Sequence, residues 1–282
     1  MESVRIPGYE LIRRLGGGPF THAWSALTTG GRTVVLKLPR QDAADPEVAC
    51  ALLRREACIG SEVFHAHLVC ILHDHTHDVP FFLAMDHAPG ESLRRRLRRA
   101  FRLPMSEAIW IARQTAEALS ALHNACYVHG DVKPENLLVT PEGRATLIDL
   151  GFAHRPGENE AFEQKGLILG TANYLAPERC ELNAIADGRA DVYSLGVMLF
   201  ELLTGRLPFT AKSMRRTLQA HREEQPADLR DYAGPWPDGL ARLLQRLLAR
   251  RPGNRPTGLP LVRELMEMEI AALGRTVRSA AG

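Results

Sequence analysis

Hydrophobic residues in the first 90 positions are grouped as in β-strands. One apolar, β-branched run extends from Arg32 to Leu38, and a second apolar run extends from Pro80 to Asp86. Runs of this length and composition predict strands. Residues 45–64, between the two runs, read as a helix. The N-terminal part is therefore predicted to be rich in strands, with one helix.

Beyond residue 104 the hydrophobic period becomes that of helices. Ser106 is the expected N-cap of a helix whose apolar side chains recur every three or four residues. These side chains are Ile109, Ala112, Ala116, Leu119 and Leu122. Residues 189–204 predict a second apolar helix that ends at Gly205, and residues 136–149 predict a hairpin. The pattern indicates an α+β fold in which the chemistry lies between a small β-rich part and a larger helical part.

Composition narrows the functional classes. The net charge of +2 gives no strong field, so we expect no nucleic-acid partner. The five cysteines are scattered without a CxxC pair, which favours a reducing compartment over a disulfide framework or a zinc ribbon. No apolar run approaches the length of a membrane span, and the first residues lack the pattern of a leader. We therefore expect a cytoplasmic location.

Two features of the first 60 residues suggest phosphate chemistry. A glycine cluster at residues 15–20 would let backbone N–H groups approach an anion, although an isolated cluster of this kind is more often a plain turn. Lys37 lies in a strand that looks buried and needs a partner. Glu56 in the following helix is the candidate, although two surface charges are the simpler interpretation.

Two later segments are more specific. Residues 129–136 read His-Gly-Asp-Val-Lys-Pro-Glu-Asn, and residues 148–151 read Ile-Asp-Leu-Gly. The first segment resembles the catalytic loop of protein kinases, and the second resembles their metal-binding Asp-Phe-Gly motif. Residues 170–178 resemble the substrate-docking loop that ends in Ala-Pro-Glu. In the same family order, residues 191–196 match the start of the central helix of the large lobe, and Arg255 resembles the arginine that pairs with the Ala-Pro-Glu glutamate.

The resemblance covers about residues 9–268 and is to eukaryotic-type (Hanks-type) serine/threonine kinases of bacteria. It implies the two-lobed kinase fold. Residues 1–85 would form the small lobe, 86–91 the hinge, 92–268 the large lobe and 269–282 a C-terminal tail. It also implies transfer of the γ-phosphoryl group of ATP to serine or threonine hydroxyls of protein substrates.

The resemblance assigns roles in the catalytic loop. Asp131 would accept the proton of the substrate hydroxyl, and Lys133 would contact the γ-phosphoryl group. Thr171 would hydrogen-bond to Asp131 and fix its orientation. Asn136 and Asp149 would hold Mg²⁺, with Mn²⁺ as an alternative, because hard cations prefer oxygen ligands.

The nucleotide would contact mainly the small lobe. Lys37 would bind the α- and β-phosphates, and Glu56 would hold Lys37. The resemblance also places Leu15, Gly16 and Gly18 over the phosphates, adenine between Ala23 and Val35 above and Leu138 below, Met85 at the gatekeeper position, and the Asp86 carbonyl and Ala88 amide in the hinge.

Four positions depart from the family pattern. Thr21 replaces the third glycine of the phosphate loop, and Leu150 replaces the phenylalanine of the metal motif. Gly130 stands where many kinases have an arginine. Gly60 lies where many have a larger apolar side chain, so the helix that carries Glu56 is predicted to be loosely anchored, awaiting an activating protein partner or a homodimer.

Two further clusters have alternative interpretations. His65, His67, His73, His75 and His77 lie near Asp74 and Asp78. One interpretation is a site for a transition metal. The resemblance to kinases favours the other, in which these residues occupy an exposed turn between strands and a loop. The run of arginines at residues 94–99 is either a solvated helix face or a dock for an acidic substrate or partner.

Two competing functions share the fold. A pseudokinase is disfavoured because the expected catalytic residues are all present. A small-molecule kinase is disfavoured because the docking loop and Arg255 serve protein substrates by resemblance. Regulation is predicted not to use loop phosphorylation. Thr171 and Tyr174 are the only hydroxyl residues between positions 149 and 178, and Glu158, Glu160 and Glu163 are fixed acids that could partly substitute for a phosphate.

Overall fold

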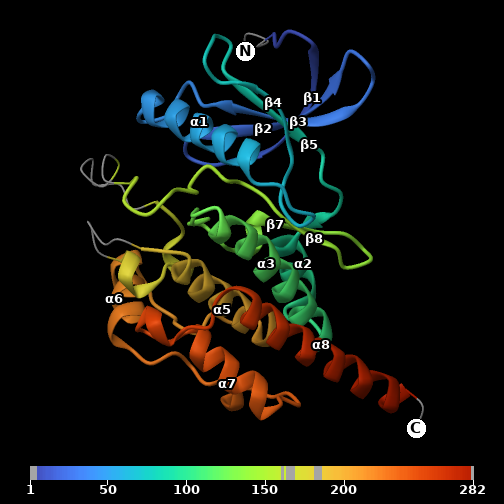
Figure 1. Cartoon of the computed structure of the whole chain (residues 1–282), viewed down its shortest axis with the longest axis vertical. Coiled ribbons are helices and arrows are strands. Elements are labelled where there is room, and N and C mark those ends of the chain that lie inside the picture. Colours follow the sequence, from blue (N-terminus) through green and yellow to red (C-terminus); the bar gives the residue numbers. More distant parts are fainter. Residues whose placement is uncertain (1–4, 160–161, 163–168, 181–185, 281–282) are drawn as a thin grey trace.

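The computed structural model describes residues 5–159, 162, 169–180 and 186–280, without the side chains of 275–280. Two parts are visible in Figure 1, one built around a sheet and one built from helices. The sheet part begins the chain, and the helical part follows it. The predicted α+β architecture with two lobes is confirmed.

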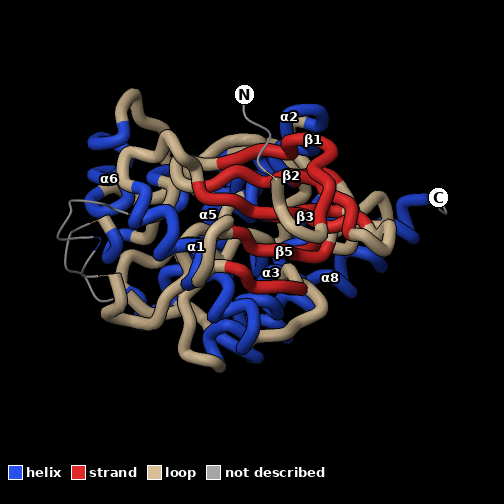
Figure 2. The backbone as a smooth tube through the Cα atoms, turned by 90° about the horizontal axis from the view of Figure 1, so that it is seen from above, coloured by secondary structure: helices blue, strands red, loops and turns tan. Residues whose placement is uncertain are grey.

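A five-stranded antiparallel sheet forms the small lobe, in the order β1-β2-β3-β5-β4. Its strands are β1 (Tyr9–Gly17), β2 (Thr21–Thr28), β3 (Thr33–Pro39), β4 (Ile71–His75) and β5 (Phe82–Asp86). The two strands predicted from sequence correspond to β3 and β5, each shifted by one or two residues at its ends. Figure 2 shows helix α1 (Pro46–Glu62) running beside this sheet. The Asp45 carboxylate caps α1 by accepting a hydrogen bond from the Val48 amide (3.1 Å).

The large lobe is mainly helical. Its helices are α2 (Leu93–Ala100), α3 (Met105–Asn124), α5 (Arg189–Thr204), α6 (Met214–Glu223), α7 (Asp238–Leu247) and α8 (Gly258–Ala280). The predicted end of α5 at Gly205 is confirmed, with φ of +71°. The predicted cap at Ser106 is wrong. Pro104 occupies the cap position of α3, and its carbonyl accepts from the Ala108 amide (2.9 Å), so Ser106 already lies in the first turn.

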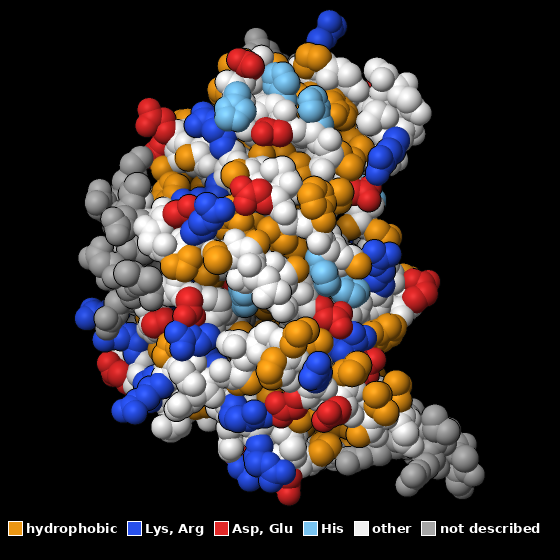
Figure 3. Space-filling model, in the orientation of Figure 1, with side chains coloured by type: hydrophobic (Ala, Val, Ile, Leu, Met, Phe, Trp, Pro, Cys, Tyr) orange, Lys and Arg blue, Asp and Glu red, His pale blue; other side chains and the backbone are white. Residues whose placement is uncertain are grey.

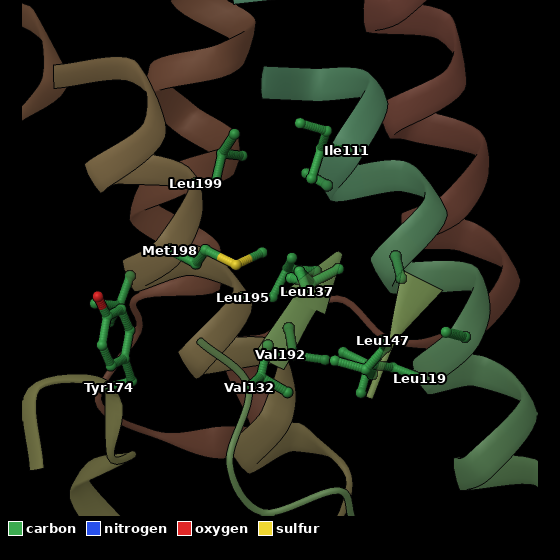
Figure 4. Close-up of a cluster of buried hydrophobic side chains, with 14 of the residues drawn as sticks. Ile111, Leu119, Val132, Leu137, Leu147, Tyr174, Val192, Leu195, Met198 and Leu199 are labelled. Atoms are coloured by element: carbon green, nitrogen blue, oxygen red, sulfur yellow. The ribbon is translucent and has the colours of Figure 1, made fainter. Parts of the chain in front are cut away.

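A second, three-stranded sheet includes the two strands that follow the catalytic loop in the chain. Strands β6 (Glu91–Ser92), β7 (Leu137–Val139) and β8 (Ala145–Leu147) pair antiparallel, which confirms the predicted hairpin. Figure 4 shows Val132 of the catalytic loop and Leu137, which follows that loop, beside Val192 and Leu195 of α5. These side chains are at most 2% exposed. The loop is therefore anchored on a close-packed core.

Helix α1 lies closer to β4 than the sequence suggested. A Cβ on Gly60 would lie only 2.1 Å from Cγ1 of Ile71. The missing side chain thus leaves no gap, because Ile71 of β4 fills the space. The prediction of a loosely anchored helix at this point is wrong, since the absence of a side chain permits a close approach of the two elements.

Candidate active site

Asp131 lies at the centre of a hydrogen-bonded group in the catalytic loop. Its Oδ1 accepts from the Thr171 hydroxyl (2.7 Å), and its Oδ2 lies 2.6 Å from Lys133 Nζ and 2.9 Å from Asn136 Nδ2. Lys133 Nζ also donates to Thr171 Oγ1 (2.6 Å). The predicted Thr171–Asp131 hydrogen bond is present. Three side chains from the catalytic loop and the docking loop therefore converge on one carboxylate.

Asp191 fixes the backbone of this loop, a role that the sequence analysis did not assign. It lies at the start of α5 and accepts from the amides of His129 (2.7 Å) and Gly130 (2.9 Å) and from the ring of His123 (2.9 Å). Burial works against its charge, but these hydrogen bonds lower the pKa of Asp191 to about 2. An acidic residue in the first turn of an apolar helix was the available signal.

Gly130 has a conformational requirement of its own. Its φ is +80°, and a Cβ there would lie 2.8 Å from the Phe152 carbonyl oxygen. Arg179 donates to the Gly130 carbonyl (2.9 Å) and to the Leu169 carbonyl (3.0 Å). A guanidinium therefore does reach this point of the catalytic loop. It belongs to Arg179, the residue after the docking loop, and it binds backbone carbonyls.

A second charged group is formed by Lys37, Glu56 and Asp149. Lys37 Nζ lies 2.5 Å from Glu56 Oε2 and 2.6 Å from Asp149 Oδ1. Glu56 also accepts from the Leu150 amide through Oε1 (3.1 Å). The Lys37–Glu56 pair expected from sequence is present, and its side chains are 8% and 0% exposed. Glu56 thereby connects α1, β3 and the metal motif.

The charges in this group stabilise one another. Burial opposes the charge on Lys37, but the carboxylates of Asp149 and Glu56 outweigh it and raise the pKa of Lys37. Burial alone would raise the pKa of Asp149, yet the neighbouring ammonium lowers it. Burial raises the pKa of Glu56 despite the ammonium. Asp149 has φ of +69°, a strained conformation for a residue other than glycine, and its side chain is 44% exposed.

The residues expected to contact the nucleotide lie on or next to strands β1, β2, β3, β5 and β7. Ala23 pairs with Gly16 on one side and with Lys37 on the other, and Val35 pairs with Met85. Leu138 lies on β7 of the small sheet. A Cβ on Gly16 or on Gly18 would meet no atom within 4 Å, so this part of the loop faces open space. Leu15 is half-exposed at 40%.

The predicted hinge groups lie close together. The Ala88 amide donates to the Asp86 carbonyl (3.0 Å), while the Asp86 amide donates to the Cys70 carbonyl (2.9 Å). The Asp86 side chain pairs with Arg32 (3.1 Å). Both backbone groups expected to contact adenine are thus on one short stretch of chain, at the end of β5 and just after it.

Four arginines of the run at residues 94–99 pair with carboxylates of the protein itself. Arg94 pairs with Glu201 (2.6 Å) and Glu135 (2.8 Å) and donates to the Tyr174 hydroxyl. Arg96 pairs with Glu107 (2.7 Å), and Arg99 pairs with Glu91 (2.5 Å). Arg95 also reaches Glu91, at 3.7 Å. Internal carboxylates therefore offset much of the positive charge that the sequence displays.

Tyr174 and Glu178 tie the docking loop to the large lobe. The Tyr174 hydroxyl donates to Glu201 (2.6 Å), and burial raises the pKa of this tyrosine. Arg255 binds Glu178 through two hydrogen bonds of 2.6 and 2.8 Å, so the predicted pair is present. Bidentate geometry of this kind is the strongest form of such a contact.

The histidine cluster does not assemble a metal site among the described residues. No group of three or more His, Cys, Asp or Glu side chains in that part of the chain could hold a metal ion. His73 instead hydrogen-bonds to Tyr9 (3.2 Å), and His75 stacks on Phe82. Figure 3 shows histidine side chains gathered on the outer surface of the small lobe. These contacts favour the interpretation of the histidines as residues of an exposed turn and a loop over that of a metal site.

The comparisons with known proteins are consistent with this geometry. Residues 9–270 match the model of the protein kinase domain. The chain is 37% identical over 252 residues to serine/threonine-protein kinase PknD of Mycobacterium tuberculosis, covering 88% of this chain and 37% of that protein. It is 28% identical over 253 residues to serine/threonine-protein kinase PrkC of Bacillus subtilis, covering 89% and 39%. The chain thus spans less than two-fifths of the length of these two relatives. Within the described residues, no helix is both long enough and apolar enough to cross a membrane.

Proposed function

Because this chain belongs to the protein kinase family, we propose that it transfers the γ-phosphoryl group of ATP to serine or threonine hydroxyls of protein substrates. The observation that carries the proposal is the arrangement around Asp131. Its carboxylate is held by Thr171, Lys133 and Asn136, and a separate Lys37–Asp149 ion pair is also formed.

Asp131 would act on the substrate hydroxyl. Its fixed carboxylate can accept a hydrogen bond from that hydroxyl, orient the oxygen for in-line attack and take up the proton. Lys133 lies 2.6 Å from the same carboxylate, so its ammonium can turn to the transferred group and offset charge there. Thr171 keeps the carboxylate in place during this exchange.

Lys37 would hold the nucleotide from the opposite side of the cleft. Its ammonium is charged and is fixed by Glu56, as binding to phosphate oxygens requires. At the hinge, adenine would exchange the Ala88–Asp86 hydrogen bond for its own bonds to the same two groups. Ala23, Val35 and Leu138 would supply the apolar surfaces, and Met85 would close the back of the site.

A divalent metal fits the available oxygen donors. We propose Mg²⁺, with Mn²⁺ as an alternative, held by the partly exposed Asp149 carboxylate and by the Asn136 amide, whose nitrogen donates to the Asp131 carbonyl (2.8 Å) and so leaves its oxygen for a cation. Such an ion would bring positive charge to the phosphate oxygens. The five free cysteines and the use of ATP favour catalysis in the cytoplasm.

We propose that the protein prefers acidic substrates, because the exposed arginines of α2 would attract them. Arg95 and Arg99 have side chains 78% and 66% exposed and share one carboxylate, Glu91. Reversing both to glutamate should raise the apparent KM for an acidic protein at low salt, with the difference shrinking as salt rises. Reversal of Arg96 serves as a comparison because Glu107 already neutralises it. An unchanged KM at low salt would favour a merely solvated helix face.

The function is tested with labelled ATP, magnesium and a generic protein substrate. Transfer to protein by the wild type, and its loss in Asp131→Asn, is the expected result. Phosphoamino-acid analysis should give phosphoserine and phosphothreonine, and mainly phosphotyrosine would refute the specificity. Nucleotide binding without transfer would identify a pseudokinase, and transfer to small molecules alone would identify the other competing class.

A further inference from the structure

Helix α1 has two apolar faces, and only one of them rests on the core. Leu53, Ala57 and Ile59 belong to the large core that joins the two lobes. Val48 and Leu52 belong to a separate cluster, with Phe162 and Leu169 from the segment that follows the metal motif. The second face of α1 is therefore covered by Phe162 and Leu169. Val48 and Leu52 on this face are each only 2% exposed.

Polar contacts join the same loop to α1. Arg55 donates to the Asn159 side-chain oxygen (2.7 Å) and to the Glu158 carbonyl (3.1 Å). Its guanidinium also lies 4.9 Å from the centre of the Phe162 ring, within the range of a cation–π contact. Asn159 and Phe162 are 7% and 8% exposed, so the contacts of Arg55 with these two side chains are largely shielded from water, whereas its bond to the Glu158 carbonyl is exposed.

The cluster also reaches the phosphate loop. Phe20, at the tip of that loop, packs against it together with Phe152, and the two rings meet edge to face at 6.3 Å. Three parts of the site thus share one small apolar group. They are the loop over the phosphates, the helix that carries Glu56 and the segment that follows Asp149, which passes beneath α1 in Figure 1.

We propose that Phe162 and Asn159, acting on Arg55, are positioning residues that hold Glu56 against Lys37 without a phosphate. Arg55 and Glu56 are adjacent on α1, so fixing the first on the loop side fixes the rotation of the helix and points the second at Lys37. The groups that receive Arg55 are an amide oxygen, a backbone carbonyl and an aromatic ring. Of the acids suggested by sequence, Glu158 attracts the Arg55 guanidinium only at longer range, because its carboxylate accepts a hydrogen bond from the Arg155 amide (2.8 Å). Glu160 and Glu163 lie outside the described residues.

The two hydroxyl residues of this segment are already in use. Thr171 binds Asp131, and the Tyr174 hydroxyl is buried between Arg94 and Glu201. A phosphate on either would disrupt the contacts that build the site. This agrees with control that does not use loop phosphorylation.

The proposal rests on the proposed kinase activity, and its test separates the two. Phe162→Ala and Arg55→Ala should each lower kcat/KM for ATP about tenfold, and the double variant should lose little more, because the two residues act as one unit. Phe162→Tyr keeps the ring and should stay within about threefold of wild type. Arg54→Ala is the matched control. It removes the same charge from the neighbouring position 54. Because Arg54 contacts the Thr76 carbonyl (3.1 Å) and not the loop that holds Arg55, turnover should change less than about twofold.

Hydrogen exchange provides a readout that does not depend on turnover. Amides of residues 46–62 should exchange faster in Phe162→Ala and in Arg55→Ala than in wild type, and at the wild-type rate in Arg54→Ala. If Phe162→Ala does not fold, Asn159→Ala replaces it in both measurements. Wild type made with a co-expressed phosphatase should keep its activity.

Unchanged exchange and unchanged kinetics in the loop variants would overturn the proposal. A loss of wild-type activity that follows removal of phosphate from Thr171 or Tyr174 would also overturn it. An inactive wild type would instead count against the proposed function, while the exchange data would still decide whether the loop holds α1.

Discussion

Replacing Gly60 with alanine tests whether α1 is tightly packed on the sheet. By helix propensity alone, Gly→Ala inside a helix should stabilise the protein by about 1 kcal/mol. At this position, however, the new Cβ would lie 2.1 Å from Cγ1 of Ile71, a mid-chain atom that cannot swing away freely. Overpacking of this kind costs about 1–3 kcal/mol. We therefore expect a net loss of about 1–2 kcal/mol, the opposite sign to the propensity.

The assay is urea unfolding together with the KM for ATP, because displacement of α1 also moves Glu56. Gly274→Ala is the matched control, since a Cβ there meets no atom within 4 Å and should stabilise or leave stability unchanged. Ile71→Ala removes the obstructing atoms, so the double variant Gly60→Ala/Ile71→Ala should be more stable than the sum of the single changes predicts. Equal or higher stability of Gly60→Ala, or strict additivity in the double variant, would refute the reasoning.

Three further outcomes follow from the geometry. Asp131→Asn and Lys37→Met should each reduce phosphoryl transfer at least about a hundredfold with an unchanged circular dichroism spectrum; near-wild-type turnover in either would contradict the assigned roles. Arg255→Ala should lower the free energy of unfolding by about 3 kcal/mol, because Glu178 loses its bidentate partner, and a change below about 0.5 kcal/mol would argue against this. Burial lowers the pKa of His221 to about 4, so the folded protein binds the proton more weakly than an unfolded histidine with a pKa near 6.5. The stability from this residue should be complete above about pH 6.5 and lost as the pH falls toward 4, and denaturant titrations of His221→Asn should show a flatter dependence.

The sequence by itself determined the identity and spacing of the groups to which we assign the chemistry. Asp131, Lys133 and Asn136 lie within six consecutive positions, so their backbone spacing brings them close whatever surrounds them. The strands and helices were also predictable, because their hydrophobic periods follow from backbone geometry alone. The ends of elements were predicted less accurately. At α3 the cap position is occupied by Pro104, so the helix begins before Ser106, the residue that the sequence pattern favoured as the cap.

Only the tertiary structure decided how distant residues meet. The Gly60 position read as a gap, yet Ile71 of β4 fills it. The arginine run read as a positive patch, yet Arg94 binds two carboxylates far away in sequence. In each case the partner is brought in by the folding of another element, and no local pattern records which side chain will arrive. The sequence therefore fixes the identity and spacing of the reactive groups, while packing between elements determines which charges are neutralised and which spaces are filled.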